Sequence, residues 1–431
     1  LVRVKANHTK RPWGPAGHIS GRTLLVALTA LAFLPTSAPA GEHPSLLITA
    51  DDLPRLRHAC GLAAATADDT EPVKAGARAN EFAALRRIVQ AREGLATLPG
   101  EVSATALLQL LAPDSPGREE RLALLNYVLT APYGIAADPF EVLLALDWCW
   151  ADLEANARRE FLLRLSNDSG VFTPADSPLD HRVFRQKLTT LAAVLAFDEA
   201  DEPGERWIEL RKRARDAGRT YFEKTFPTFV QWRGLAPTSP SAGPDEEADA
   251  ALALELATRL LERDVWAEYR DSVGRWLEHY LYASFSSSEL QHGFVRDDGS
   301  DAPLMPITRW GALTPLTAHL IARRTTDPAA AFIAQRVEQR LSGRTTVPYA
   351  LAWIWVPIVC DTADVARADF AALPAARNFG GAVTFRRQHG GFEAGIWIEA
   401  TQPHLRRRQH FDAGHFLIYS GMPLTVSGGD D

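Results

Sequence analysis

Successive amphipathic helical segments constrain the fold of this chain more than any other feature. From Glu42 to about Leu373, apolar side chains recur at the three- and four-residue spacing of helices that bury one face. The segments are EFAALRRIVQARE, REERLALLNYVLT, FEVLLALDWCWADL, ARREFLLRLS, FRQKLTTLAAVLAF, ERWIELRKRARDAGRTYFEKTF, DEEADAALALELATRLLER and WAEYRDSVGRWLEHYLYASF. The alternating pattern of a strand is almost absent there. The sequence therefore predicts a large, mainly α domain.

The segments between these helices are long and polar. TPADSPLD (Thr173 to Asp180) and APTSPSAGPDE (Ala236 to Glu246) carry the Pro, Gly, Ser and Asp residues that end one helix and cap the next. In a helical scaffold such loops usually lie at the open end of the structure, where binding residues are presented. No sequence repeat of fixed period accompanies them, so a solenoid is not predicted.

A different pattern begins near Asn378. GAVTFRR, GFEAGIWIEATQ and HFLIYS alternate apolar and polar residues and are bounded by Gly and Pro, which predicts antiparallel strands. About three or four strands are recognisable, fewer than a closed antiparallel sandwich requires. We therefore expect residues 376–431 to be the first part of a β-sandwich in a truncated gene product.

The N-terminal residues read as a leader and a secretory signal. Arg22 precedes an apolar run from Thr23 to Leu34, and Ala38 and Ala40 form an A-x-A cleavage signature. The run is too short for a stable membrane-spanning helix but fits the apolar part of a signal peptide. We expect residues 1–40 to be removed, leaving the helical domain at 41–375 in a chain exported to the periplasm or beyond and not inserted in a membrane.

Charge and cysteine content exclude two classes of protein. The formal net charge of −7, without a basic stripe interleaved with aromatic residues, argues against a nucleic-acid partner. Only Cys60, Cys149 and Cys360 are present, so disulfides cannot be the main source of stability. Cys149 lies on an apolar helix face and is predicted to be a small buried hydrophobe rather than a nucleophile.

Three stretches resemble the heparinase II/III-like family of polysaccharide lyases. HPSLLITADDLPRLR (His43 to Arg57) is similar to the opening segment of that family, and LLALDWCWADLEANARRE (Leu143 to Glu160) to its helix with an acidic and aromatic YDW centre. QHFDAGHFLIY (Gln409 to Tyr419) resembles the HxHxDAGxFxIY segment that begins the family's sandwich. The resemblance implies an (α/α) toroid followed by an antiparallel β-sandwich. It also implies cleavage of an acidic, uronate-containing polysaccharide by β-elimination; the first two stretches are not catalytic.

β-Elimination requires three separate actions: a carboxylate is neutralised, a base removes the C5 proton, and an acid protonates the leaving oxygen. His181, in SPLDHRVFRQKL, resembles a segment that the family places in the toroid cleft, and we expect it to be the neutraliser or the base. The alternative is an ordinary helix-start residue with Asp180 as the N-cap. Arg182 is predicted to bind a uronate carboxylate.

Other residues complete the predicted cleft. Tyr221 is predicted as a catalytic phenol, although aromatic residues at helical spacing more often fill a core, and Tyr269 and Tyr280 are alternatives with the same reservation. His292, in the loop sequence ELQHGFVRDDG, is expected to bind substrate together with Arg296.

The resemblance also implies a zinc site. His410 matches the second His of the family segment, and the His-x-Asp spacing places His410 and Asp412 on one face of a strand. Asp430 is the predicted third ligand. Because two ligands alone do not make a site, a structural His–Asp pair at a turn is the alternative.

Two departures from the family pattern leave other functions open. Arg408 stands where the first His is expected; an arginine neutralises a carboxylate, which keeps Arg408 in the predicted catalytic set, but it does not readily act as a base. Ser427 replaces an expected Asp. A catalytically degenerate carbohydrate-binding or structural protein is therefore one alternative. A glycoside hydrolase is another, with carboxylates at Asp245, Glu246 and Glu247, although a charged helix start explains these better.

Overall fold

The structure is a computed structural model in which the described residues are mainly helical, and this confirms the mainly α part of the predicted fold class. It describes residues 43–62, 76–90, 100–131, 138–168, 170–176, 181–198, 201–202, 204–233, 244–273, 293–294, 305–306, 314–328, 330–331, 334, 355–360, 365, 376–378, 382–389, 392–399 and 416–420. All of these belong to one compact unit, residues 38–431. Within these ranges no helix combines the length and apolar composition needed to cross a membrane.

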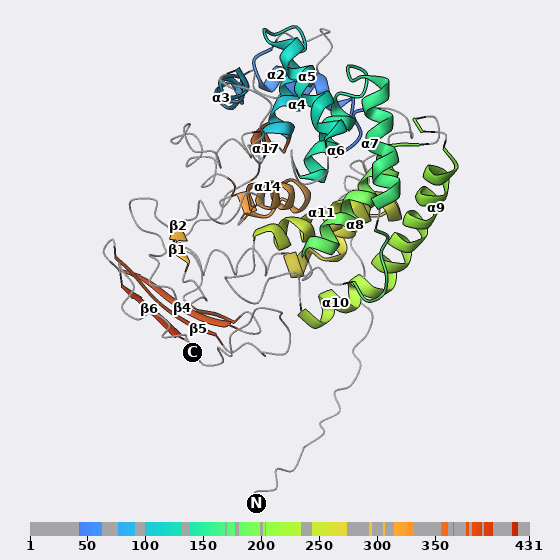
Figure 1. Cartoon of the computed structure of the whole chain (residues 1–431). Coiled ribbons are helices and arrows are strands. Elements are labelled where there is room, and N and C mark those ends of the chain that lie inside the picture. The colour runs from blue at the N-terminus through green and yellow to red at the C-terminus, as the bar shows by residue number, and fades with distance from the viewer. Residues whose placement is uncertain are drawn as a thin grey trace, which may run out of the picture. The chain divides into compact units, whose positions relative to one another are not determined.

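Eight of the longer helices form two rows (Figure 1). The inner row, in which each helix contacts the next, consists of α4 (Glu101–Leu111), α6 (Pro139–Trp148), α8 (His181–Ala196), α11 (Pro244–Leu261) and α14 (Thr314–Thr325). The outer row consists of α5 (Arg118–Thr130), α7 (Ala155–Asp168) and α9 (Glu205–Thr220). From α4 to α9 the chain therefore alternates between the two rows.

Burial distinguishes the two rows. Nearly every residue of α4 and α6 is buried, so these inner helices are enclosed on all sides. On α9 the buried residues Trp207, Leu210, Ala214 and Gly218 recur at helical spacing, so this helix buries one stripe and exposes the rest. A Cβ at Gly218 would lie only 2.9 Å from Leu260 Cδ2, so α9 approaches α11 closely at this point.

The structure describes further helices outside the two rows. They are α2 (Asp52–Ala59), α3 (Ala79–Gln90), α10 (Phe226–Arg233), α12 (Val265–Glu268) and α17 (Val356–Val359). The segment expected as one helix from residue 205 to residue 226 is interrupted by the π-helical turn η2 (Tyr221–Thr225). Pro227 explains the interruption, because it has no N–H to donate to the carbonyl of Glu223.

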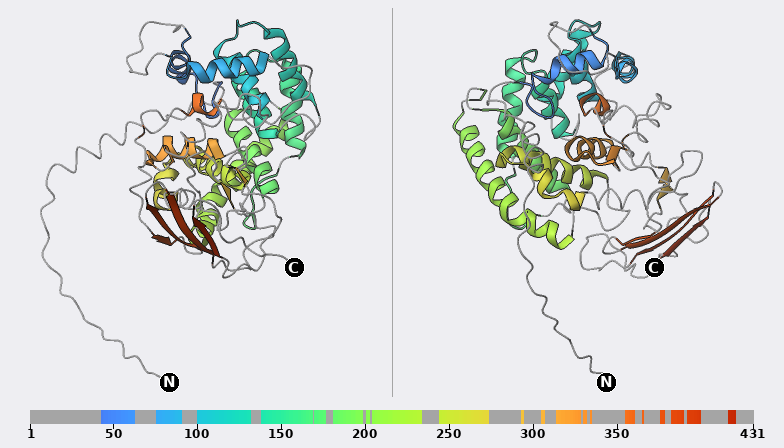
Figure 2. Two further views of the ribbon diagram at one scale, coloured as in Figure 1. Left: turned by 90° about the vertical axis from the view of Figure 1, so that its left-hand side faces the viewer. Right: turned by 180° about the vertical axis from the view of Figure 1, so that it is seen from behind.

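The strands predicted after Asn378 are present in one antiparallel sheet. Its order is β3-β4-β5-β6, with bounds Ala376–Asn378, Ala382–His389, Phe392–Glu399 and Phe416–Ser420. Phe385 pairs with Ile396, and Ile396 pairs with Ile418. The longer strands are the dark red arrows in Figure 2. A short second pair joins β1 (Gly293–Phe294) to β2 (Met305–Pro306). This sheet is a single layer, and the β-sandwich expected to contain it stays a prediction.

All three cysteines are buried and unpaired in disulfides. Burial raises the pKa of the Cys149 thiol, which donates a hydrogen bond to the carbonyl of Ala106 at 3.4 Å. This environment matches the predicted packing role of Cys149, because an apolar site suppresses the thiolate that a nucleophile needs.

Candidate functional site

The predicted site residues differ in how much of them the structure describes. His181 and Arg182 begin α8, where their backbone is described and their side chains are not. Tyr221 is described in full. The remaining residues lie outside the described ranges, so their roles stay predictions; they are Arg408, His292, Arg296, His410, Asp412 and Asp430.

The loop before α8 is fastened to that helix by Asp176. Both carboxylate oxygens of Asp176 accept hydrogen bonds from Lys187 Nζ at 2.5 Å, and one accepts from the backbone N–H of Thr173. Asp176 precedes His181 in the chain and Lys187 follows it on α8. The ion pair therefore joins a residue that precedes His181 in the chain to a residue that follows it.

Tyr221 lies beneath this loop rather than at a surface. Its side chain is 1% exposed, its ring stacks on Phe172 at 4.5 Å, and its hydroxyl donates to the carbonyl of Asp176 at 3.3 Å. Burial raises the pKa of the phenol. These contacts fit the packing alternative for Tyr221, while its catalytic role stays a prediction.

A buried arginine near the start of α8 connects three inner helices. Arg185 Nη1 lies 2.8 Å from Asp249 Oδ1 on α11, and Nη2 lies 3.7 Å from Asp138, the N-cap of α6. The guanidinium also covers the ring of Phe140 at 4.9 Å. Because Arg185 lies one turn after His181, these contacts fix the part of α8 that carries the predicted site.

Glu141 is a buried carboxyl group that the sequence reasoning missed. Both of its oxygens accept from the backbone N–H of Gly100, at 2.9 and 2.8 Å, where α4 begins. Burial and the charge of Asp138 raise its pKa to about 8, against the lowering effect of the Gly100 bond and Arg185. Burial therefore favours the protonated form of Glu141 more than in an exposed glutamate. The available signal was a single acid within the apolar stretch PFEVLLAL.

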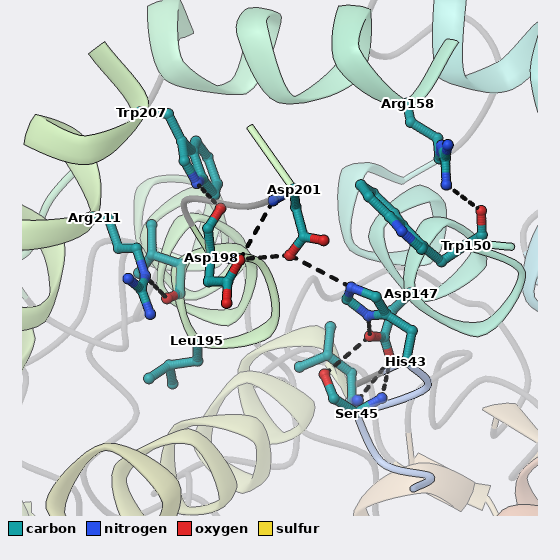
Figure 3. A network of polar contacts seen from close by, with 12 residues as sticks. His43, Ser45, Asp147, Trp150, Arg158, Leu195, Asp198, Asp201, Trp207 and Arg211 are labelled. Atoms are coloured by element: carbon teal, nitrogen blue, oxygen red, sulfur yellow. Dashed lines mark hydrogen bonds and ion pairs between the residues drawn. The ribbon is translucent and has the colours of Figure 1, made fainter. Parts of the chain in front are cut away.

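A second polar network surrounds Asp147 (Figure 3). The Asp147 side chain is fully buried and accepts hydrogen bonds from His43 Nδ1 at 2.8 Å, Ser45 N at 2.8 Å, Ser45 Oγ at 2.9 Å and Leu46 N at 2.6 Å. On the opposite side of the imidazole, His43 Nε2 lies 3.6 Å from Asp201 Oδ2. His43 is therefore held between two carboxylates.

The residues His43 to Ile48, here called the N-terminal strap, are joined to several helices around this network. The His43 ring lies 4.9 Å from Trp150 and 4.8 Å from Phe197, the residue that follows α8. Arg259 of α11 donates to the carbonyl of Ser45 at 2.7 Å, and Trp148 Nε1 of α6 donates to that of Leu46 at 2.8 Å. The strap is thus part of the helical core.

The two carboxylates keep His43 charged. Burial alone would lower its pKa, but the hydrogen bonds and charges of Asp147 and Asp201 raise it from 6.5 to about 9. Burial would raise the pKa of Asp201, and the bonds from His43 and the Asp198 backbone lower it. With only 4% of its side chain exposed, His43 acts as a buried cation that fastens the strap rather than as a group presented to substrate.

This network predicts that stability falls at alkaline pH. Because folded His43 binds its proton more tightly than the unfolded chain does, its contribution is complete below pH 6.5 and is lost as the pH rises toward 9. We expect a loss of about 1–2 kcal/mol, reduced from the full pKa difference by screening and by the nearby Arg158 and Arg259. Urea unfolding between these pH values measures it. His43→Gln should flatten the pH dependence, and an unchanged slope in that variant would contradict the assignment.

The network unites two of the family-like stretches of the sequence. The strap opens the stretch from His43 to Arg57, and Asp147 lies in the stretch from Leu143 to Glu160. Neither was predicted to be catalytic, and their contacts are those of a structural joint. The sequence marked both stretches but did not indicate that they bind each other.

Family models and curated proteins do not assign the chain to a family. Models of protein families give no match, and curated proteins give no significant similarity. Within the described ranges, no group of three or more His, Cys, Asp or Glu residues is placed to hold a metal ion. The family and its zinc site therefore stay predictions.

Proposed function

We propose that the protein is a secreted or periplasmic polysaccharide lyase that cleaves a uronate-containing glycan by β-elimination. The contact between the strap and Asp147 supports this most directly. Two stretches that resemble one lyase family are far apart in the sequence, yet Asp147 accepts hydrogen bonds from the Ser45 and Leu46 N–H groups and the Ser45 hydroxyl. A resemblance in two segments that depend on each other argues for a shared scaffold more strongly than either segment alone.

The helix arrangement supports an (α/α) toroid as that scaffold. Inner and outer helices alternate along the chain from α4 to α9, as in a closed array of helical hairpins, and each inner helix contacts the next. In this proposal the sheet β3-β4-β5-β6 is the first layer of the following β-sandwich.

The proposed chemistry is centred on the start of α8. Arg182 binds the uronate carboxylate and His181 neutralises it or removes the C5 proton, with Arg408 as another predicted catalytic group. The burial of Tyr221 favours its packing alternative over the predicted catalytic role. Imidazole and carboxylate donors suit zinc, so His410, Asp412 and Asp430 would hold the ion if it binds. Zinc would supply positive charge for a carboxylate.

An absorbance assay tests the proposal. Elimination leaves an unsaturated uronate that absorbs in the ultraviolet, whereas hydrolysis leaves none. We expect the absorbance to rise with at least one member of a panel of uronic-acid polysaccharides. Reducing ends formed without this absorbance would instead indicate a glycoside hydrolase.

Tyr221→Phe should have a small effect. The ring keeps its contacts, and the lost hydrogen bond to Asp176 lowers the free energy of unfolding by about 0.5–1.5 kcal/mol. We expect turnover to stay within about threefold of the unmodified protein, since removing a true proton donor costs about 10²–10⁴-fold. Urea unfolding and the absorbance assay measure both effects, with Tyr127→Phe on α5 as a control at an exposed position. A hundredfold loss of turnover would establish Tyr221 as the catalytic acid.

Arg408 favours a second candidate function. Because the first His of the family segment is replaced by a group that does not readily remove protons, the same scaffold would bind an acidic glycan without cleaving it. Measurable binding of a uronate polysaccharide without any absorbance change would support this candidate over the lyase.

A further inference from the structure

The loop before α8 and the first turns of α8 form a ring closed by one ion pair. Asp176 and Lys187 have side-chain exposures of only 12% and 11%, so water screens their attraction weakly. On α9, by contrast, Arg213 and Glu209 are 62% and 72% exposed and lie 3.9 Å apart. Because the Asp176–Lys187 pair is partly buried, we expect it to hold the backbone more strongly than an exposed surface pair does.

Aromatic side chains also pack against the residues that precede α8. Tyr221 bonds to the carbonyl of Asp176 and stacks on Phe172, which also packs edge-on against Phe184 of α8 at 5.5 Å. The Lys187 stem covers Gly170, where an added Cβ would lie 3.2 Å from Lys187 Cγ. Residues 170–176 are therefore fixed to α8 at both ends of this range.

His181 and Arg182 lie within this ring in sequence. The pair joins residues separated by eleven positions, and the two predicted site residues come between them. Closing so short a segment restricts the paths by which the chain can enter α8. Arg185, held by Asp249, fixes the same helix on another side.

We propose that the Asp176–Lys187 pair is a positioning device for the active site, with Tyr221 as its support. By closing the ring it holds the backbone of His181 and Arg182 where a uronate is to be bound, although it contacts no reacting atom itself. The catalytic meaning of this inference rests on the proposed function, whereas the ring does not. Misplacement of a catalytic group by about 1 Å typically costs about 100-fold in rate, so such a device would matter to turnover.

The test compares three variants of the full chain. Lys187→Met removes the charge and keeps most of the stem, Lys187→Arg keeps the charge, and Arg213→Met breaks the exposed pair as a matched control. We expect hydrogen exchange of the amides in 170–187 to become about tenfold faster in Lys187→Met and to change by less than about twofold in the other two. Exchange in α5 should stay unchanged in all three.

Two further measurements separate positioning from stability alone. In histidine-labelled protein, the NMR titration of His181, assigned through His181→Gln, should shift in Lys187→Met and be restored in Lys187→Arg. If the chain is a lyase, kcat/KM should fall about tenfold or more in Lys187→Met and recover with arginine.

Each result decides a separate point. Unchanged exchange in Lys187→Met would overturn the ring, and faster exchange with an unaltered His181 titration would overturn positioning. A wild-type chain inactive on every glycan would count against the proposed function but not the ring, because exchange and titration need no turnover. If hydrogen exchange in α5 also becomes faster in Lys187→Met, Asp176→Asn is used in its place and judged by the same criteria. The asparagine keeps an acceptor for the Thr173 N–H.

Discussion

Asp147→Ala is expected to lower the free energy of unfolding by about 3–5 kcal/mol, because it leaves a buried cation and several donors without an acceptor. The donors are His43 Nδ1, the Ser45 N–H and hydroxyl, and the Leu46 N–H, all now bound to one fully buried carboxylate. Urea unfolding at neutral pH measures the loss. The strap should also become the first segment cut in limited proteolysis, because Asp147 is its main anchor.

Asp152→Ala is the matched control for this prediction. Asp152 follows α6, the helix that carries Asp147, and its carboxylate accepts hydrogen bonds from Gln109 and Arg118. Its side chain is 31% exposed. Water can replace its bonds, so we expect a loss of about 1 kcal/mol or less. Equal losses in the free energy of unfolding of Asp147→Ala and Asp152→Ala would show that the buried network around Asp147 stabilises the fold no more than an exposed one does.

His181→Ala is expected to reduce kcat of the proposed lyase by about 10²–10⁴-fold, the usual contribution of a positioned acid or base. A polar residue at a helix start contributes little to packing, so the free energy of unfolding should change by less than about 0.5 kcal/mol. The absorbance assay and urea unfolding are run on the same preparation.

His58→Ala provides the comparison for His181. His58 lies in the last turn of α2 and has no predicted role in the site, so its loss should leave kcat within about twofold. Full turnover by His181→Ala would return His181 to the alternative of an ordinary helix-start residue. A joint loss of turnover and stability would likewise fail to support a catalytic role.

Amphipathic pattern predicted the outer helices better than the inner ones. α5 has the bounds of the predicted segment REERLALLNYVLT, and its buried residues recur at helical spacing from Arg121 to Leu129. α4 was missed: its sequence EVSATALLQLL is buried almost throughout, and burial includes the polar residues Glu101, Thr105 and Gln109, so polarity does not mark an exposed face. The interruption after Thr220 was also missed, because the effect of Pro227 on the preceding turn requires knowing which carbonyl loses its partner.

The candidate site was predictable only where a local motif carried it. The sequence placed His181 after a polar loop and at a helix start, and its backbone lies there. The Asp176–Lys187 pair has a separation of 11 residues, and the bond from Ser45 to Asp147 spans 102, so neither follows from helical periodicity. The raised pKa of Glu141 arises first from burial, which depends on the packing of α6 against α4, and α4 had not been predicted.

The strap has a consequence for the order in which this protein is completed during synthesis. His43 to Ile48 leave the ribosome before any partner: Asp147 follows about a hundred positions later, and the Arg259 bond to Ser45 spans 214 residues. Contacts of such long sequence separation form slowly and late. The strap must therefore wait for Asp147, and its contacts are complete only when α11 has been made. The helical core that includes the strap is thus unfinished until that point in translation.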